Sequence, residues 1–90
     1  MKGRRLFYSG HVQGVGFRYA VRQIAAGYDV TGSVRNLPDG RVELFIQGAA
    51  DELSAMEREI ADSHLNGFVK SVESADVAVD LALRGFNIER

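Results

Sequence analysis

The sequence contains no cysteine among its 90 residues, and it carries almost no excess charge. Without cysteine there is no disulfide framework, no thiolate nucleophile and no cysteine-based metal site. Eleven lysine and arginine residues stand against twelve acidic ones, which leaves a formal net charge of −1. The chain therefore has no global positive field that would gather nucleic acid or an acidic membrane, and any anion site must be local.

Long apolar runs are also missing. Leu6-Phe7-Tyr8 is followed at once by Ser9-Gly10, so this run is too short for a signal peptide. No other stretch approaches the ~20 apolar residues of a membrane helix. We expect a cytoplasmic monomer with no membrane partner. We also expect residues 1–90 to form one domain, because a second domain would have no core of its own.

The first half of the chain predicts a strand, a helix and a hairpin. A short strand is expected over residues 6–9, and a glycine-rich loop follows it. The next segment predicts an amphipathic helix, because its apolar residues recur at helical spacing: Phe17, Ala20, Val21, Ile24, Ala25 and Tyr28. Residues 31–36 and 41–47 predict a β-hairpin, since the Pro38-Asp39-Gly40 sequence between them is typical of a turn.

The second half predicts one helix and two further strands. The helix is expected over residues 51–64, with an inner row formed by Leu53, Met56, Ile60 and His64. Asn66-Gly67 is typical of a helix C-cap. Strands are expected over residues 68–79 and 81–88, with a bulge at Gly85.

This order of elements predicts the fold. A β-α-β-β-α-β sequence with a short last strand is typical of the ferredoxin-like α+β sandwich. Because crossover connections are right-handed, both helices should cover one face of a mostly antiparallel sheet.

The segment from Gly10 to Arg18 carries the clearest chemical signal. Three glycines in a loop between a strand and a helix let successive backbone N–H groups turn toward one point. Such a concave row of amides binds anions, and the start of the following helix adds its positive dipole end. The guanidinium of Arg18 can reach back over the loop and match two oxygens of a phosphoryl group.

Two segments of the chain resemble the signatures of the acylphosphatase family. Gly10-His11-Val12-Gln13-Gly14-Val15-Gly16-Phe17-Arg18 is similar to the pattern Gly-x-Val-Gln-Gly-Val-x-Phe-Arg. The segment from Gly32-Ser33-Val34-Arg35-Asn36 through Gly40 and Val42 to Gly48 is similar to the family's second signature. The resemblance covers essentially the whole chain and implies the same βαββαβ fold.

The resemblance implies a reaction and a role for each site residue. Gln13, Gly14, Val15, Gly16, Phe17 and Arg18 would hold the phosphate, with Arg18 binding its oxygens, and Asn36 would orient the attacking water. The family hydrolyses acyl phosphates to a carboxylate and inorganic phosphate by direct attack of water on phosphorus. The implied partners are therefore a small acyl phosphate and phosphate, and neither a metal nor a cofactor is implied.

Two departures from the family pattern stand near these motifs. Ser33 occupies a position that is usually aromatic, which removes bulk close in sequence to Asn36 and could loosen the site. Tyr8 occupies a position where an aliphatic residue is common.

Other readings of the same residues remain open. The fold also occurs as a domain of larger proteins that handle carbamoyl phosphate, so a non-catalytic or accessory phosphate-binding module is the main alternative. An RNA-binding domain would need Phe7 and Phe45 exposed on the open sheet face within basic surroundings, which the net charge disfavours.

His11 and His64 have no third metal ligand at useful spacing. A turn and an outward strand position account for Asp39 and Glu43.

Overall fold

The computed structural model describes residues 1–90 and confirms the predicted order of elements. The elements are β1 (Lys2–Gly10), α1 (Phe17–Ala25), β2 (Val30–Asn36), β3 (Val42–Gly48), α2 (Ala50–Asp62), the 3₁₀ helix η1 (His64–Phe68), β4 (Val69–Val77) and β5 (Phe86–Glu89).

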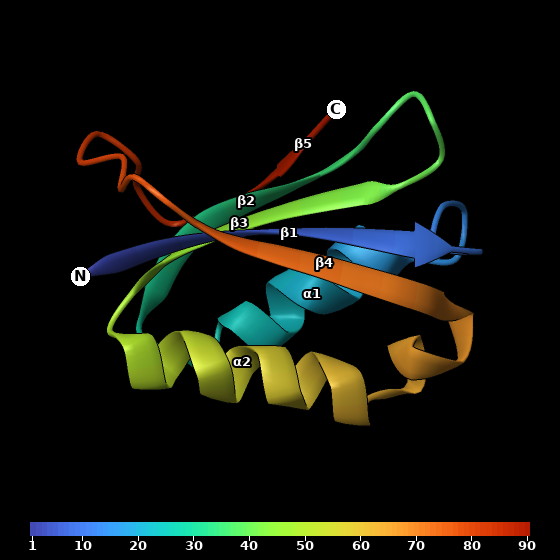
Figure 1. Ribbon diagram of the computed structural model, residues 1–90, viewed down its shortest axis with the longest axis horizontal. Coiled ribbons are helices and arrows are strands. Elements are labelled where there is room, and N and C mark those ends of the chain that lie inside the picture. The colour runs from blue at the N-terminus through green and yellow to red at the C-terminus, as the bar shows by residue number, and fades with distance from the viewer.

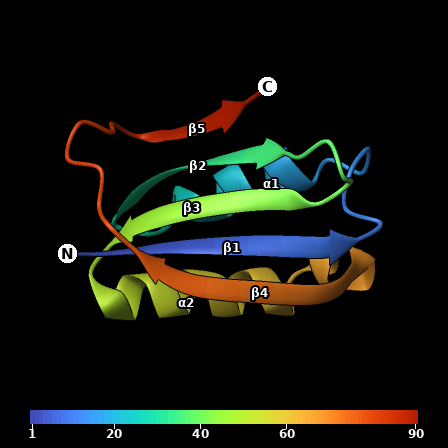
Figure 2. The same ribbon diagram turned by 45° about the horizontal axis from the view of Figure 1, so that its top comes forward.

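Five strands form one sheet in the order β4-β1-β3-β2-β5. Neighbouring strands are antiparallel except for β2 and β5, which run parallel. Both helices cover the same face of the sheet (Figures 1 and 2). No helix covers the other face, and the loop that precedes β5 lies at one end of it. This is the predicted ferredoxin-like sandwich, and the short extra strand at the C-terminus is present.

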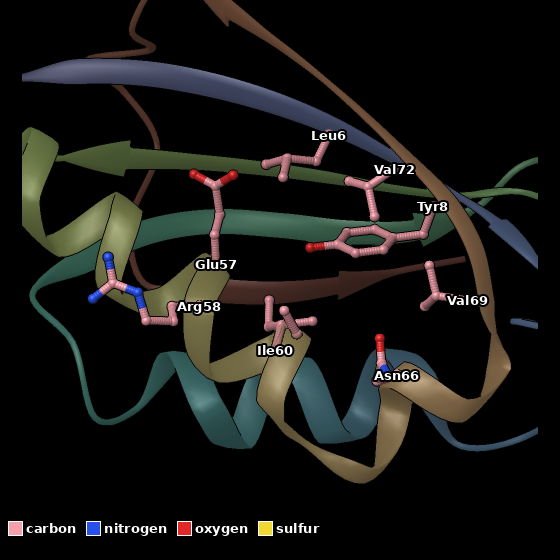
Figure 3. Close-up of a pocket in the computed structure, with 9 residues that line it drawn as sticks. Leu6, Tyr8, Glu57, Arg58, Ile60, Asn66, Val69 and Val72 are labelled. Atoms are coloured by element: carbon pink, nitrogen blue, oxygen red, sulfur yellow. The ribbon is translucent and has the colours of Figure 1, made fainter.

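The core lies between the sheet and the two helices. Strand periodicity turns alternate residues of β1 and β3 toward the helices, so Leu6, Leu44 and Ile46 are buried there. Tyr8 shares this face of β1 and lies on the side of the sheet that faces α2 (Figure 3). The helices contribute the apolar rows that their spacing predicts: Phe17, Val21 and Ala25 from α1, and Leu53, Met56 and Ile60 from α2.

The end of the second helix differs from the prediction. α2 stops at Asp62, and residues 64–68 form η1 instead of a C-cap at Asn66-Gly67. The Ser63 hydroxyl accepts a hydrogen bond from the Leu65 N–H at 3.2 Å and so begins the new turn. As a result Leu65 takes the buried position, and His64, predicted for the inner row, is exposed.

The C-terminal segment is less regular than predicted. Strand β5 begins only at Phe86, after a turn at residues 81 and 82. Gly85 is not a bulge: it lies in the bend before β5 with φ of 66°, and its carbonyl accepts from the Gly32 N–H at 2.9 Å. The register shift of the sheet is instead in β1, between Ser9 and Gly10, where it pairs with β4.

Candidate active site

The loop between β1 and α1 turns at two glycines with left-handed backbone geometry. Gly14 and Gly16 both have φ of 78°, a region that side chains disfavour. Nothing lies within 4 Å of the place where a Cβ would stand at either position. Backbone conformation, and not crowding, therefore accounts for the glycines. Gly16 directly precedes α1, and its carbonyl accepts the Ala20 N–H at 3.0 Å.

Most backbone amides of this loop have no partners within the protein. The His11 N–H donates to the Phe68 carbonyl at 2.9 Å, but no N–H group from Gln13 to Arg18 donates to a protein acceptor. The last of these amides belong to the first turn of α1, where the helix dipole is positive and no acidic residue stands. Six consecutive free donors at a helix N-terminus can bind an anion.

A cleft of about 180 Å³ brings the loop together with the end of β2. Four of the predicted residues line it from the loop and α1: Gly14, Gly16, Phe17 and Arg18. Asn36 lines it from β2, although it lies 18 residues beyond Arg18 in the sequence. The remaining walls are formed by Val12, Tyr19 and Ile88.

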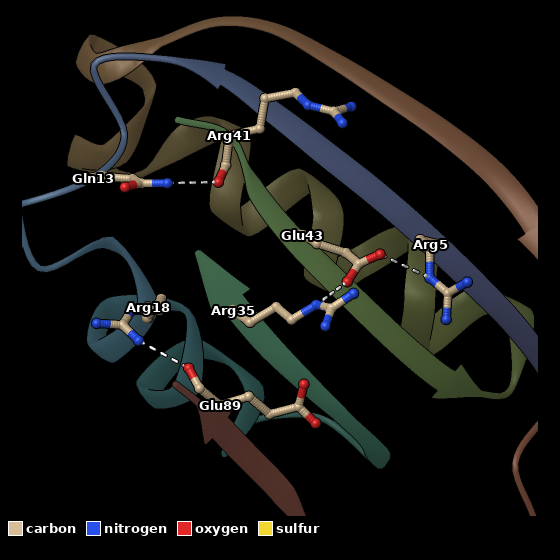
Figure 4. Close-up of polar contacts among 7 residues, drawn as sticks. All are labelled: Arg5, Gln13, Arg18, Arg35, Arg41, Glu43 and Glu89. Atoms are coloured by element: carbon tan, nitrogen blue, oxygen red, sulfur yellow. Dashed lines mark hydrogen bonds and ion pairs between the residues drawn. The ribbon is translucent and has the colours of Figure 1, made fainter. Parts of the chain in front are cut away.

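The side chain of Arg18 is held by the C-terminal strand. Its Nη1 donates to the backbone carbonyl of Glu89 in β5 at 2.9 Å (Figure 4). This contact uses one nitrogen of the guanidinium and leaves its other donors available. Sequence reasoning could not identify it, because the acceptor is a backbone carbonyl, which every residue carries.

Gln13 and Val15 do not line the cleft with their side chains. The Gln13 Nε2 donates to two carbonyls of the β2–β3 hairpin, Leu37 at 2.8 Å and Arg41 at 2.9 Å (Figure 4 shows the second). Val15 packs against the core. Only the backbone amides of these two residues are available to an anion, and the Gln13 side chain ties the loop to the hairpin.

Asn36 and Ser33 lie on opposite faces of β2. Asn36 pairs with Val42 in the sheet, and both belong to the face covered by the helices. Ser33 pairs with Phe45 and lines a groove on the open face. Any effect of the missing aromatic residue on the site must therefore act through the strand and not through direct contact with Asn36.

The remaining titratable candidates lie outside the cleft. His11 is exposed, and Asp39 accepts the backbone N–H of Arg41 within the hairpin turn. Glu43 lies on the open face between Arg5 and Arg35, with which it forms ion pairs (Figure 4).

The open face of the sheet does not present bare aromatic rings. The guanidinium of Arg5 lies 5.4 Å from the ring centre of Phe45, and that of Arg41 lies 4.7 Å from the ring centre of Phe7. Phe45 is only 8% exposed. A base could not stack on either ring without displacing an arginine.

Comparison with known proteins identifies the family. The family model described as Acylphosphatase matches residues 4–88. The chain belongs to the acylphosphatase family. It is 44% identical over 89 residues to an acylphosphatase of Trichormus variabilis, covering 94% of this chain and 83% of that one. It is 38% identical over 84 residues to an acylphosphatase of Pseudomonas aeruginosa, covering 93% and 91%. The acylphosphatases are hydrolases of acyl phosphates, and this chain is a member of that class.

Solved structures share the fold. The crystal structure of an acylphosphatase from Bacillus subtilis superposes with a TM-score of 0.89 at 29% identity, over all of both chains. The structure of HypF from T. kodakarensis superposes with a TM-score of 0.85 at 25% identity. That match covers all of this chain but only 12% of HypF, so the same fold also occurs as a small part of a much longer protein. No helix of the present structure is long and apolar enough to cross a membrane.

Proposed function

We propose that the cleft is the active site and that it hydrolyses acyl phosphates by direct attack of water on phosphorus. The loop amides from Gln13 to Arg18 and the guanidinium of Arg18 hold the phosphoryl oxygens, and the Asn36 amide orients the water. One observation carries this proposal: Asn36 lines the same cleft as Arg18 and the loop with free backbone N–H groups, although these residues come from separate elements.

The hydrolysis of an acyl phosphate requires few catalytic groups from the protein. A carboxylate is a good leaving group, so catalysis depends on positioning the water and balancing charge on the phosphoryl oxygens. Fixed N–H donors provide that balance without reorganising during the reaction. The Asn36 amide has both a donor and an acceptor, so it can hold a water molecule without carrying a charge that would repel the bound anion. The water oxygen bonds to phosphorus as the phosphorus–carboxylate bond breaks.

The proposed reaction needs no metal. Nowhere does the structure gather three His, Asp or Glu side chains that could hold an ion. The test is hydrolysis of benzoyl phosphate by the purified chain in excess chelator, with inorganic phosphate as a competitive inhibitor. Loss of activity in chelator, restored by Mg²⁺ or Zn²⁺, would overturn the metal-independent mechanism.

A non-catalytic phosphate-binding module is the second candidate, because the fold also forms 12% of HypF. The same assay separates the two. Phosphate binding without hydrolysis of benzoyl phosphate would favour the module, whereas turnover favours the enzyme. RNA binding is disfavoured by the arginines that cover Phe7 and Phe45.

The oligomeric state and the cellular location of the enzyme are also proposals. We propose that the enzyme is cytoplasmic. We also propose that it is a monomer, because the loop, Arg18 and Asn36 of the proposed site all belong to one chain. Light scattering coupled to size exclusion would test the monomer, and a fluorescent fusion in the native cell would test the location.

A further inference from the structure

A groove lined by arginine side chains adjoins the proposed active site. Its volume is about 450 Å³, and it lies between α1 and β5. Its lining residues are Arg18 and Arg22 from α1, and Phe86, Asn87, Ile88 and Arg90 from β5 and the residue that follows it. Arg18 and Ile88 also line the cleft of the proposed active site. A molecule whose phosphoryl group lies in the cleft can therefore extend past Arg18 into this arginine groove.

The positive charges of the arginine groove are not neutralised by carboxylate side chains. Arg18, Arg22 and Arg90 form no ion pair, and no acidic residue lines the groove. Glu89 precedes Arg90 in the sequence, but it lines the groove on the open face of the sheet, and its carboxylate extends away from Arg18 (Figure 4). Three like charges on one concave surface repel one another and attract an anionic group.

The Arg22 side chain is held between the arginine groove and the cleft. It lies four positions after Arg18, so both side chains are on one face of α1, with about 5–6 Å between their Cβ atoms. Its guanidinium lies 5.5 Å from the ring centre of Tyr19, which lines the cleft. A side chain that already rests on an aromatic ring loses less freedom when it binds a ligand. Arg22 therefore offers a second cation about one helical turn from Arg18.

We propose that the arginine groove binds the acyl end of the substrate and favours acyl phosphates whose acyl end carries a second anionic group, such as a carboxylate. This inference rests on the proposed function, because it requires the phosphoryl group to lie in the cleft. Arg18 contacts the phosphoryl group and the Glu89 carbonyl, so Arg22 and Arg90 bind the second anionic group. The planar fork of a guanidinium matches the two oxygens of a carboxylate. Attack of water on phosphorus then releases a dicarboxylate and inorganic phosphate.

The test compares 4-carboxybenzoyl phosphate with 4-methylbenzoyl phosphate. The two substrates share the ring and the acyl phosphate, and they differ only in the group at the far end of the ring. At low ionic strength, where screening is weak, we expect kcat/KM to be roughly three- to tenfold higher for the carboxylated substrate, the worth of one charged contact at a partly exposed site.

Variants of the two arginines test their role directly. Arg22→Gln and Arg90→Gln each remove one charge from an exposed side chain, so the fold should persist. The preference for the carboxylated substrate should fall in each variant and disappear in the double variant, while kcat/KM for 4-methylbenzoyl phosphate stays near its wild-type value. The control is Arg84→Gln, which changes the net charge equally at an exposed residue outside the groove and should keep the preference.

Equal kcat/KM for the two substrates in the wild type would overturn this proposal and leave the proposed hydrolysis intact. A preference that persists in the double variant would also overturn it. Loss of the preference in Arg84→Gln would assign the effect to net charge and not to the groove. A chain that hydrolyses neither substrate would overturn the proposed function, and this inference with it.

Discussion

At the scale of single residues, Arg18 is the only charged side chain that lines the proposed active site. We expect Arg18→Ala to lower kcat/KM by about 10²–10³-fold, the usual cost of removing one donor to a developing charge. Arg18→Lys should recover little, because an ammonium cannot both bond the Glu89 carbonyl and match two phosphoryl oxygens. Steady-state kinetics with benzoyl phosphate measure both variants.

The matched control for Arg18 is on the same helix. Arg22 lies one turn further on, with its guanidinium 5.5 Å from the ring centre of Tyr19 and outside the cleft. Arg22→Lys should therefore keep near-wild-type kcat/KM for benzoyl phosphate, whose acyl end is uncharged. If Arg18→Lys were equally active, the proposal that the Arg18 guanidinium binds two phosphoryl oxygens would be wrong.

A substitution of Asn36 can distinguish an effect on phosphate binding from an effect on the chemical step. If its amide orients water, Asn36→Ala should lose most of kcat, by about 10²-fold or more, while phosphate binds with nearly unchanged affinity. The loop amides and Arg18 do not depend on this side chain, so the ground-state contacts remain. Phosphate titration and kinetics on the same variant measure the two effects. Asn66→Ala, in η1 and away from the cleft, is the control.

The opposite result for Asn36 is equally informative. If phosphate affinity weakened in proportion to kcat/KM, Asn36 would be a phosphate-binding residue and not a water-orienting one. Thermal unfolding of the variant must accompany the kinetics, because Asn36 is the last residue of β2 before the hairpin turn.

At the scale of elements, the Gln13 side chain connects the β1–α1 loop, the proposed phosphate-binding loop, to the β2–β3 hairpin. Gln13→Ala removes two hydrogen bonds to backbone carbonyls and should lower the free energy of unfolding by about 1–3 kcal/mol. Phosphate affinity should also fall, because the loop amides lose the contact that orders them. Denaturant unfolding and phosphate titration measure the two losses.

A second glutamine provides the control for this element. Gln23 is exposed on α1, so Gln23→Ala should change neither stability nor phosphate affinity. Unchanged phosphate affinity in a folded Gln13→Ala would show that the loop holds its shape without the hairpin.

At the scale of the whole molecule, the buried Tyr8 links stability to alkaline pH. Its pKa is raised by burial above the ordinary value of 10.0. At a pH between the ordinary pKa and the raised one, Tyr8 has lost its phenol proton in the unfolded chain and still holds it in the folded chain. The contribution of Tyr8 to the free energy of unfolding should therefore be fully present below pH 10. It should fall as the pH rises beyond 10, by up to about 1.4 kcal/mol per pH unit.

Tyr8→Phe tests this linkage. The variant removes the titrating group and a hydroxyl that makes no hydrogen bond within the protein, so at neutral pH it should be about as stable as the wild type or more so. Above pH 10 it should lose less stability than the wild type, as measured by thermal unfolding at each pH. The control Tyr19→Phe, at a residue 55% exposed, should follow the wild type. Parallel curves for all three proteins would show that Tyr8 does not govern alkaline unfolding.

The sequence alone determined the order of the elements, the β2–β3 hairpin and the segment that carries the free amides. These features have local causes: helical and strand periodicity, the turn chemistry of Pro38-Asp39-Gly40, and the left-handed backbone at Gly14 and Gly16. The position of Arg18 directly after the glycine loop already indicated an anion-binding role. The family signatures added Asn36, because a single asparagine before a turn carries no chemical signal of its own.

Only the tertiary structure decided how these residues are held and what lies behind them. The Glu89 carbonyl that anchors Arg18 and the two carbonyls that hold Gln13 are backbone groups, so no residue type announces them. The helix predicted to residue 64 stops at Asp62 because Ser63 caps a new turn and Leu65 fills the core. An apolar cavity beside Tyr8 arises where α2, η1 and two strands fail to close completely, which is a property of packing between distant segments and not of any one of them.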